Sequence, residues 1–150
     1  MECIKILLVE DDPGHALLIQ KNLRRSGITN EILLIDNGQS AMDYLSANPC
    51  ELGRHEGLLI LLDLNLPVLS GYEVLERIKS DEEMKKIPVV ILTTTDIPQE
   101  IARCYELGCN IFITKPIQYD EFCTTVRNLG LLLSIIKVSE FGVRQLQKVN

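Results

Sequence analysis

The sequence predicts an α/β fold with a five-stranded parallel sheet covered by helices on both faces. Five short apolar runs alternate along the chain with segments in which apolar residues recur at helical spacing. Most connections between these segments are short, and the runs end in polar or charged clusters. Alternation of this kind is typical of parallel strands joined by right-handed crossovers, which wind helices onto both faces of the sheet.

The expected strands are mostly apolar along their length, as strands buried on both faces are. The central one runs from Leu58 to Leu62 and leads directly into Asp63. The others are expected at 4–9, 31–35, 87–92 and 110–114. A strand this apolar does not need a carboxylate at its tip for folding. Asp63 lies instead at the edge where open α/β sheets bind ligands, so we expect it to carry the chemistry.

Five helices are expected between and after the strands. The first runs from Pro13 to Arg25, because proline suits the first helical turn and Gly27 can end the helix. The next three are expected at 39–46, from about 71, and at 98–107, and the last begins near Tyr119. The whole chain, 1–150, is expected to be a single domain with a core over about 3–133 and a C-terminal helical extension or tail.

Composition narrows the classes of function. The formal net charge of −6 argues against a nucleic-acid-binding surface, which normally needs a basic stripe. The five cysteines are odd in number and form no C-x-x-C pair, which favours free thiols in a cytoplasmic protein over disulfides or a zinc site. Neither a signal peptide nor an apolar segment long enough to span a membrane is expected.

Polar groups follow four of the predicted strands: Asp11 and Asp12, Asp63, Thr93 and Lys115. Because parallel strands place their carboxyl ends on one edge, these groups are expected to converge. The three carboxylates outnumber the single ammonium, and Mg²⁺ would balance the excess, since it prefers hard oxygen ligands. The set therefore predicts a site for a phosphoryl group, with Asp63 as the nucleophile.

In these residues and their spacing, the chain resembles the receiver domain of two-component response regulators over about residues 3–133. The resemblance lies in the acidic pair after the first strand, Asp63 after the third, Thr93 thirty residues later, and Lys115-Pro116 a further twenty-two residues on. It implies a flavodoxin-like (βα)5 doubly wound fold with strand order 2-1-3-4-5. It also implies a phosphoacceptor signalling domain that promotes only its own phosphorylation and dephosphorylation, rather than an enzyme acting on other substrates.

The resemblance implies a role for each matching position. Asp63 is similar to the phosphoacceptor, and Lys115 to the lysine that pairs with the phosphoryl group. Thr93 is similar to the hydroxyl that moves toward the phosphate on activation, and Phe112 to the aromatic switch residue. The Mg²⁺ ligands would be Asp11, Asp12, Asp63 and the backbone carbonyl of Asn65. Pro116 matches a proline that often follows a cis peptide bond, and the sequence leaves its state open.

The implied partner is a sensor histidine kinase. We expect no DNA-binding or catalytic segment after the receiver-like part, and we therefore expect output through protein–protein contacts of the face formed by the fourth helix, fifth strand and fifth helix. The loop from Ala47 to Gly57 and the Thr93-Thr94-Thr95 run are similar to stand-alone regulators that partner phytochrome-type kinases. The apolar end of the last helix, 129–136, predicts either an extended core helix or a homodimer surface, and we favour the homodimer.

Three other functions are alternatives to phosphoryl acceptance. A Mg²⁺-dependent aspartyl phosphohydrolase needs a second acid two residues after the nucleophile, where this chain has Asn65. A flavin or dinucleotide carrier needs a glycine- or hydroxyl-rich loop where this chain has three acids. A receiver-like adaptor that works without phosphorylation stays open. His15 and His55 are both interpreted as surface residues.

Overall fold

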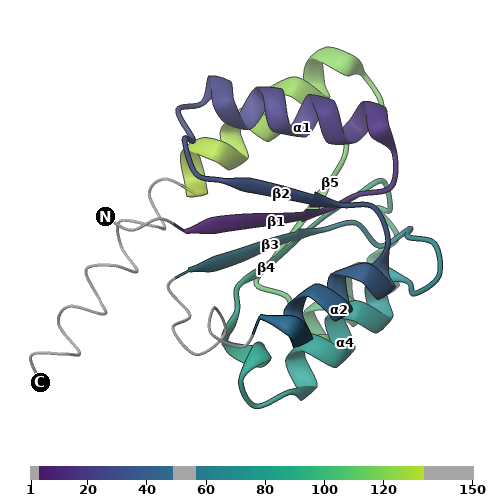
Figure 1. Ribbon diagram of the computed structural model, residues 1–150. Helices are drawn as coiled ribbons and strands as arrows, with labels where there is room; N and C mark the ends of the chain where they lie inside the picture. The colour runs from purple at the N-terminus through teal and green to yellow at the C-terminus, as the bar shows by residue number, and fades with distance from the viewer. Residues whose placement is uncertain (1–3, 49–56, 134–150) are drawn as a thin grey trace, which may run out of the picture.

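The computed structural model describes residues 4–48 and 57–133. A single parallel sheet lies between two layers of helices, as Figure 1 shows. Its strand order is β2-β1-β3-β4-β5, so the predicted doubly wound topology is confirmed. Strands and helices alternate along the chain. The strands are β1 (Lys5–Val9), β2 (Ile32–Ile35), β3 (Leu58–Leu62), β4 (Val89–Thr93) and β5 (Ile111–Thr114); the helices are α1 (Pro13–Arg25), α2 (Gly38–Ala47), α4 (Gly71–Ser80), the 3-10 turn η1 (Met84–Lys86) and α5 (Pro98–Leu107). A last helix covers residues 119–133.

The two faces of the sheet form two separate apolar cores. On one face, α1 and the last helix cover Ile6, Leu8 and Leu61 of the sheet. On the other, α2, α4 and α5 cover Leu7 and Ile60. Alternation along each strand sends neighbouring side chains to opposite faces, so uniformly apolar strands are what a sheet covered on both faces needs. Within the described residues, no helix is both long and apolar enough to cross a membrane.

The helix ends follow local chemistry. Ser70 caps α4 by accepting from the Glu73 amide, while the Glu73 carboxylate accepts from the Ser70 amide, which is a capping box. Gly108 ends α5 in the left-handed conformation, with φ of 107°. Ile97 begins α5 without a side-chain cap. None of the threonines at 93–95 therefore caps this helix.

The loop after β3, residues 63–71, is held close to two helix starts. A Cβ on Gly71 would lie 2.2 Å from the Asp63 carbonyl oxygen, and one on Gly38 would lie 2.0 Å from the Leu69 carbonyl oxygen. Both positions therefore need glycine for close approach of backbone. Within the same loop, Val68 is 82% exposed and has φ of 70°. A β-branched residue in this region is strained, so the loop carries stored backbone strain beside Asp63.

Two predictions lie mostly outside the described residues. They are the loop from Ala47 to Gly57, of which 49–56 is not described, and the tail after 133, which includes the end of the proposed dimer helix. Of the part of that helix that is described, Leu129 and Leu133 are buried, while Leu131 and Leu132 are 54% and 40% exposed.

Candidate phosphoacceptor and metal site

Strand register brings the predicted polar groups to one edge. Val9 of β1 pairs with Leu62 of β3, so Glu10 and Asp63 leave the sheet side by side. Thr93 ends β4 and pairs with Thr114 of β5, which puts Lys115 one residue beyond that pair. The Lys115 amide also donates to the Thr93 carbonyl at 2.6 Å. The main chain thus fixes where each of these side chains starts.

Asp63 is 6% exposed, and both of its carboxylate oxygens are hydrogen-bonded. Oδ1 accepts from the Thr93 hydroxyl at 2.8 Å and from the Asn65 amide at 3.1 Å. Oδ2 accepts from Lys115 Nζ at 3.0 Å. Thr93 and Lys115 are themselves 0% and 3% exposed. The structure therefore brings Asp63, Thr93 and Lys115 into direct contact in a largely dry setting.

Glu10 also belongs to this cluster, although it is not among the site residues expected from the sequence. Its Oε1 accepts from Lys115 Nζ at 2.5 Å, and its residue is only 2% exposed. Burial raises the pKa of Glu10 from 4.5 to about 7; the Lys115 hydrogen bond opposes this rise and the nearby Asp63 charge adds to it. Glu10 is therefore a buried carboxyl group in direct contact with the Lys115 ammonium.

Carboxylate oxygens of Glu10, Asp11 and Asp63 lie within 4.8 Å of one another. Asp11 is exposed, whereas the other two are buried, so the cluster has one side open to solvent. Lys115 supplies one positive charge against three carboxylates, which leaves negative charge uncompensated when all three are ionised. Hard oxygen donors with a wet side suit a divalent cation that keeps some of its waters, so these residues fit the expected metal.

Asp12 was predicted as a metal ligand, and the structure places it elsewhere. Its Oδ1 accepts from the amides of Gly14 at 2.9 Å and His15 at 3.1 Å, so Asp12 is the N-cap of α1. The His15 amide contributes most to holding the pKa of Asp12 below its ordinary value. The reason is local: Pro13 occupies the first helical position, which makes the preceding residue the cap. Glu10, and not Asp12, belongs to the group of carboxylates that lie within 4.8 Å of one another.

Of the remaining predicted residues, Asn65 contacts this cluster and Phe112 packs against the core. Asn65 is exposed and donates its amide to Asp63. Phe112 is half-buried against the core on the α5 side, and its amide donates to the Tyr105 hydroxyl at 3.1 Å. The described part of the chain contains no cis peptide bond, so the Lys115–Pro116 bond is trans. His15 was interpreted as a surface residue, but its Nδ1 lies 3.1 Å from Lys115 Nζ.

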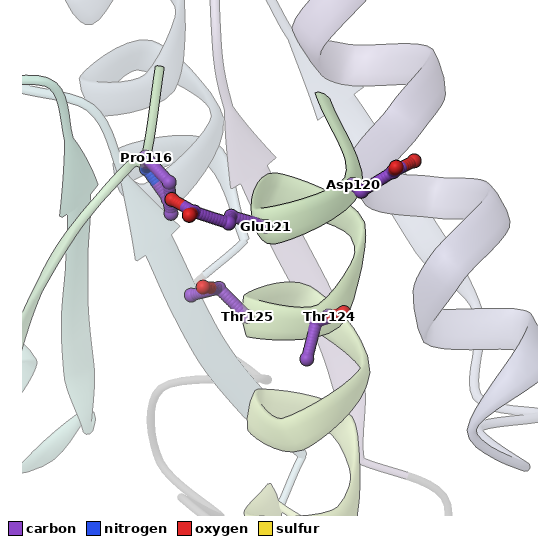
Figure 2. Close-up of a pocket in the computed structure, with 5 residues that line it drawn as sticks. All are labelled: Pro116, Asp120, Glu121, Thr124 and Thr125. Atoms are coloured by element: carbon purple, nitrogen blue, oxygen red, sulfur yellow. The ribbon is translucent and has the colours of Figure 1, made fainter. Parts of the chain in front are cut away.

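A separate open hollow lies beside the start of the last helix. It is lined by Pro116, Asp120, Glu121, Thr124 and Thr125. Figure 2 shows the Glu121 side chain extending toward Pro116, while Asp120 points to the other side of the helix. None of its lining residues belongs to the cluster around Asp63, so the hollow is not the phosphoacceptor site.

Fold and site together define a class of protein. It is a doubly wound α/β domain with a buried aspartate at the carboxyl edge, contacted by a hydroxyl and a lysine beside a carboxylate cluster. This combination is that of an aspartate-phosphorylated signalling domain.

The family comparison agrees. Residues 6–127 match the response regulator receiver domain, and the chain belongs to that family. It is therefore a receiver domain of the two-component signalling systems, whose members interact with histidine kinases and bind a divalent metal at an acidic pocket.

Relatives of known sequence include stand-alone regulators. The chain is 39% identical to the probable methanogenesis regulatory protein FilR2 of Methanothrix harundinacea, covering 83% of this chain and 79% of that protein. It is 41% identical to response regulator Rcp1 of Synechocystis, covering 73% of this chain and 75% of that protein.

Solved structures give the same fold. A receiver domain from Rhodospirillum rubrum superposes with a TM-score of 0.81 at 47% identity, covering 88% of this chain and 94% of that one. The phosphorylated cyanobacterial phytochrome response regulator RcpA gives 0.75 at 39%, covering 85% and 91%. The Mn²⁺-bound form of Rcp1 gives 0.73 at 37%, covering 84% and 91%.

Proposed function

We propose that this chain accepts a phosphoryl group on Asp63 from a sensor histidine kinase in a Mg²⁺-dependent reaction. The observation that carries the proposal is the contact set of Asp63, which is buried and hydrogen-bonded to Thr93, Asn65 and Lys115. In the transfer, a carboxylate oxygen of Asp63 attacks phosphorus. The bond from phosphorus to the kinase histidine nitrogen breaks, and its electron pair stays on that nitrogen.

Each residue of the cluster has a part in this step. Glu10, Asp11 and Asp63, with the Asn65 carbonyl, would hold Mg²⁺, whose charge offsets that of the phosphoryl oxygens when it is bound. Lys115 offers a fixed ammonium and Thr93 a hydroxyl where negative charge appears. The chain promotes only its own phosphorylation and dephosphorylation in this proposal.

A small phosphodonor tests the proposal without the kinase. Acetyl phosphate with Mg²⁺ should add one phosphoryl group by intact-protein mass spectrometry, and the adduct should be lost in base. Asp63→Asn should abolish the adduct. Asp96→Asn is the matched control, because Asp96 is an exposed aspartate that follows the neighbouring strand β4. A phosphoryl adduct that persists in Asp63→Asn would contradict the proposal.

Output is proposed to pass through Thr93 and Phe112 to the face formed by α5, β5 and the last helix. The Thr93 hydroxyl now donates to Asp63, and a phosphoryl group would compete for it as a stronger acceptor. Phe112 lies on β5 and is half-buried against the core on the α5 side. Beryllium fluoride with Mg²⁺ should change the NMR signals of the Phe112 ring, and Thr93→Ala should remove the change.

The partner kinase is proposed to be of the phytochrome type, acting in the cytoplasm. Similarity to RcpA, a phytochrome response regulator, supports this, and the three described cysteines are buried free thiols. Phosphotransfer from a panel of purified kinases should be fastest from a phytochrome-type one.

A homodimer through the last helix is also proposed, supported by exposed Leu131 and Leu132. Light scattering at high concentration should then give twice the monomer mass, and Leu131→Glu should halve it.

A further inference from the structure

The Lys115 ammonium has three acceptors, and one of them is a histidine. Nζ lies 2.5 Å from Glu10 Oε1, 3.0 Å from Asp63 Oδ2 and 3.1 Å from His15 Nδ1. An ammonium has three N–H bonds and no acceptor, so each N–H has one partner. Donation to Nδ1 also requires that this nitrogen carry the lone pair, which places the ring proton of neutral His15 on Nε2.

His15 is held in this position from two sides. Its amide donates to the cap residue Asp12 at 3.1 Å, which fixes the first turn of α1. Its ring packs edge-to-face on Phe122, with centroids 5.2 Å apart and planes at 75°. Phe122 is itself only 4% exposed in the last helix. The ring is thus held by α1 and the last helix, while its Nδ1 faces Lys115, which follows β5.

A neutral acceptor at this place has a particular consequence. Two carboxylates already draw the ammonium inward, and a third would add negative charge where a phosphoryl group must arrive. Asp12 Oδ2 lies 3.9 Å from His15 Nδ1. Without His15, the third N–H would therefore turn to a mobile water or to this carboxylate, which would bring the negative charge that a neutral ring avoids. A fixed acceptor limits reorganisation of the ammonium during the reaction.

We propose that His15 is a positioning residue for phosphorylation of Asp63, acting through Nδ1 on the Lys115 ammonium. The inference rests on the proposed phosphoryl acceptance and adds a residue of α1 to it. The reaction itself is unchanged: a carboxylate oxygen of Asp63 forms the new bond to phosphorus. With acetyl phosphate as donor, the phosphorus–oxygen bond breaks, and acetate leaves with the electron pair.

The kinetic test compares two substitutions of different chemistry. His15→Leu removes the acceptor and should slow Asp63 labelling by acetyl phosphate and Mg²⁺ roughly three- to tenfold. His15→Asn restores an acceptor oxygen near the position of Nδ1 and should return the rate to within about twofold of the wild type. In a Lys115→Met background, His15→Leu should cause no further slowing, because the lysine through which it acts is gone.

The second arm needs no phosphorylation. The ¹⁵N NMR signal of His15 Nδ1 should be that of an acceptor nitrogen in neutral imidazole, and it should shift in Lys115→Met. Equal rates for wild type and His15→Leu, or equally slow Leu and Asn variants, would overturn the proposal, as would an Nδ1 signal unchanged in Lys115→Met. If wild-type protein takes no label at all, it is the proposed function that fails, and the NMR arm still decides the His15–Lys115 contact.

Discussion

The two ends of the sheet use polar side chains in different ways. At the amino-terminal end, they bond to main chain: Asn30 donates to the Ile4 carbonyl at 2.6 Å, and Asn110 accepts from the Val89 amide at 2.8 Å. Lys79 donates there to the Ile87 carbonyl at 2.8 Å. At the carboxyl end, the polar side chains bond chiefly to one another.

This difference separates folding from function. A side chain that hydrogen-bonds a main-chain group stabilises the fold, and its polar atom is then not available for chemistry. The cluster of Glu10, Asp63, Thr93 and Lys115 instead concentrates charge and uses few main-chain partners, and the loop that follows Asp63 contains the strained residue Val68. We therefore expect that the polar groups at the carboxyl end of the sheet serve the chemistry at some cost in stability, whereas those at the amino-terminal end only stabilise the fold.

The largest effect is expected from adding a side chain at Gly71, which packs against the backbone of Asp63. Gly71→Ala would put a methyl group within 2.5 Å of backbone atoms of residues 63 and 64, so that loop must shift. We expect the free energy of unfolding to fall by about 3 kcal/mol and Asp63 labelling to slow. Gly57→Ala, at the amino-terminal end of β3 with no atom within 4 Å of its Cβ, is the control and should change neither. Chemical denaturation and acetyl phosphate labelling measure both.

The amino-terminal end should respond in stability alone. Asn110→Ala leaves the buried Val89 amide without its acceptor and should cost about 2 kcal/mol in urea unfolding. Phosphorylation of the folded variant should proceed at the wild-type rate. A labelling rate that falls in Asn110→Ala would break the contrast between the two ends.

The carboxyl end should carry a distinctive pH dependence in the presence of a chelator. Because the pKa of Glu10 is about 7 in the folded protein and near 4.5 when unfolded, the folded state binds more protons between these values. Its contribution to stability is therefore full below about pH 4.5 and is lost as pH rises through 7, with a slope of at most about 1.4 kcal/mol per pH unit. Glu10→Gln should remove this slope from urea titrations, and exposed Glu82→Gln should leave it in place.

The smallest effect concerns strain. Val68→Gly relieves a positive φ at an exposed position and should raise the free energy of unfolding by up to about 1 kcal/mol. Val68→Ala should gain much less, because alanine keeps its Cβ. A Val68→Gly protein that is less stable than the wild type would show that the loop stores no strain there.

The fold was predictable because its signal is redundant. Five apolar runs and the helical spacing between them specify layers and order together, and the expected α1 bounds of Pro13 and Arg25 agree with the structure. Asp63 and Lys115 were found because each directly follows a strand, and Thr93 because it lies at the end of one; register then aligns the three.

The rest of the site depends on which way a side chain points. Asp11 and Asp12 are equivalent by composition, and only the cap of α1 removes Asp12 from the edge. The proline after Asp12 was the available signal, since it marks Asp12 as the cap and leaves Glu10 and Asp11. His15 gave no comparable signal, because its contact with Lys115 joins residues a hundred positions apart. Nor does the sequence around Val68 reveal its backbone conformation.

The central claim is that Asp63 carries the phosphoryl group while Glu10 and Asp11 share its cation. A crystal structure with Mg²⁺ and beryllium fluoride tests it most directly. We expect beryllium bonded to an Asp63 oxygen, Lys115 and Thr93 hydrogen-bonded to fluorine, and the cation bound by Glu10 and Asp11, directly or through water, while Asp12 still caps α1. Beryllium fluoride bound away from Asp63, or a cation coordinated by Asp12 instead of Glu10, would contradict the account.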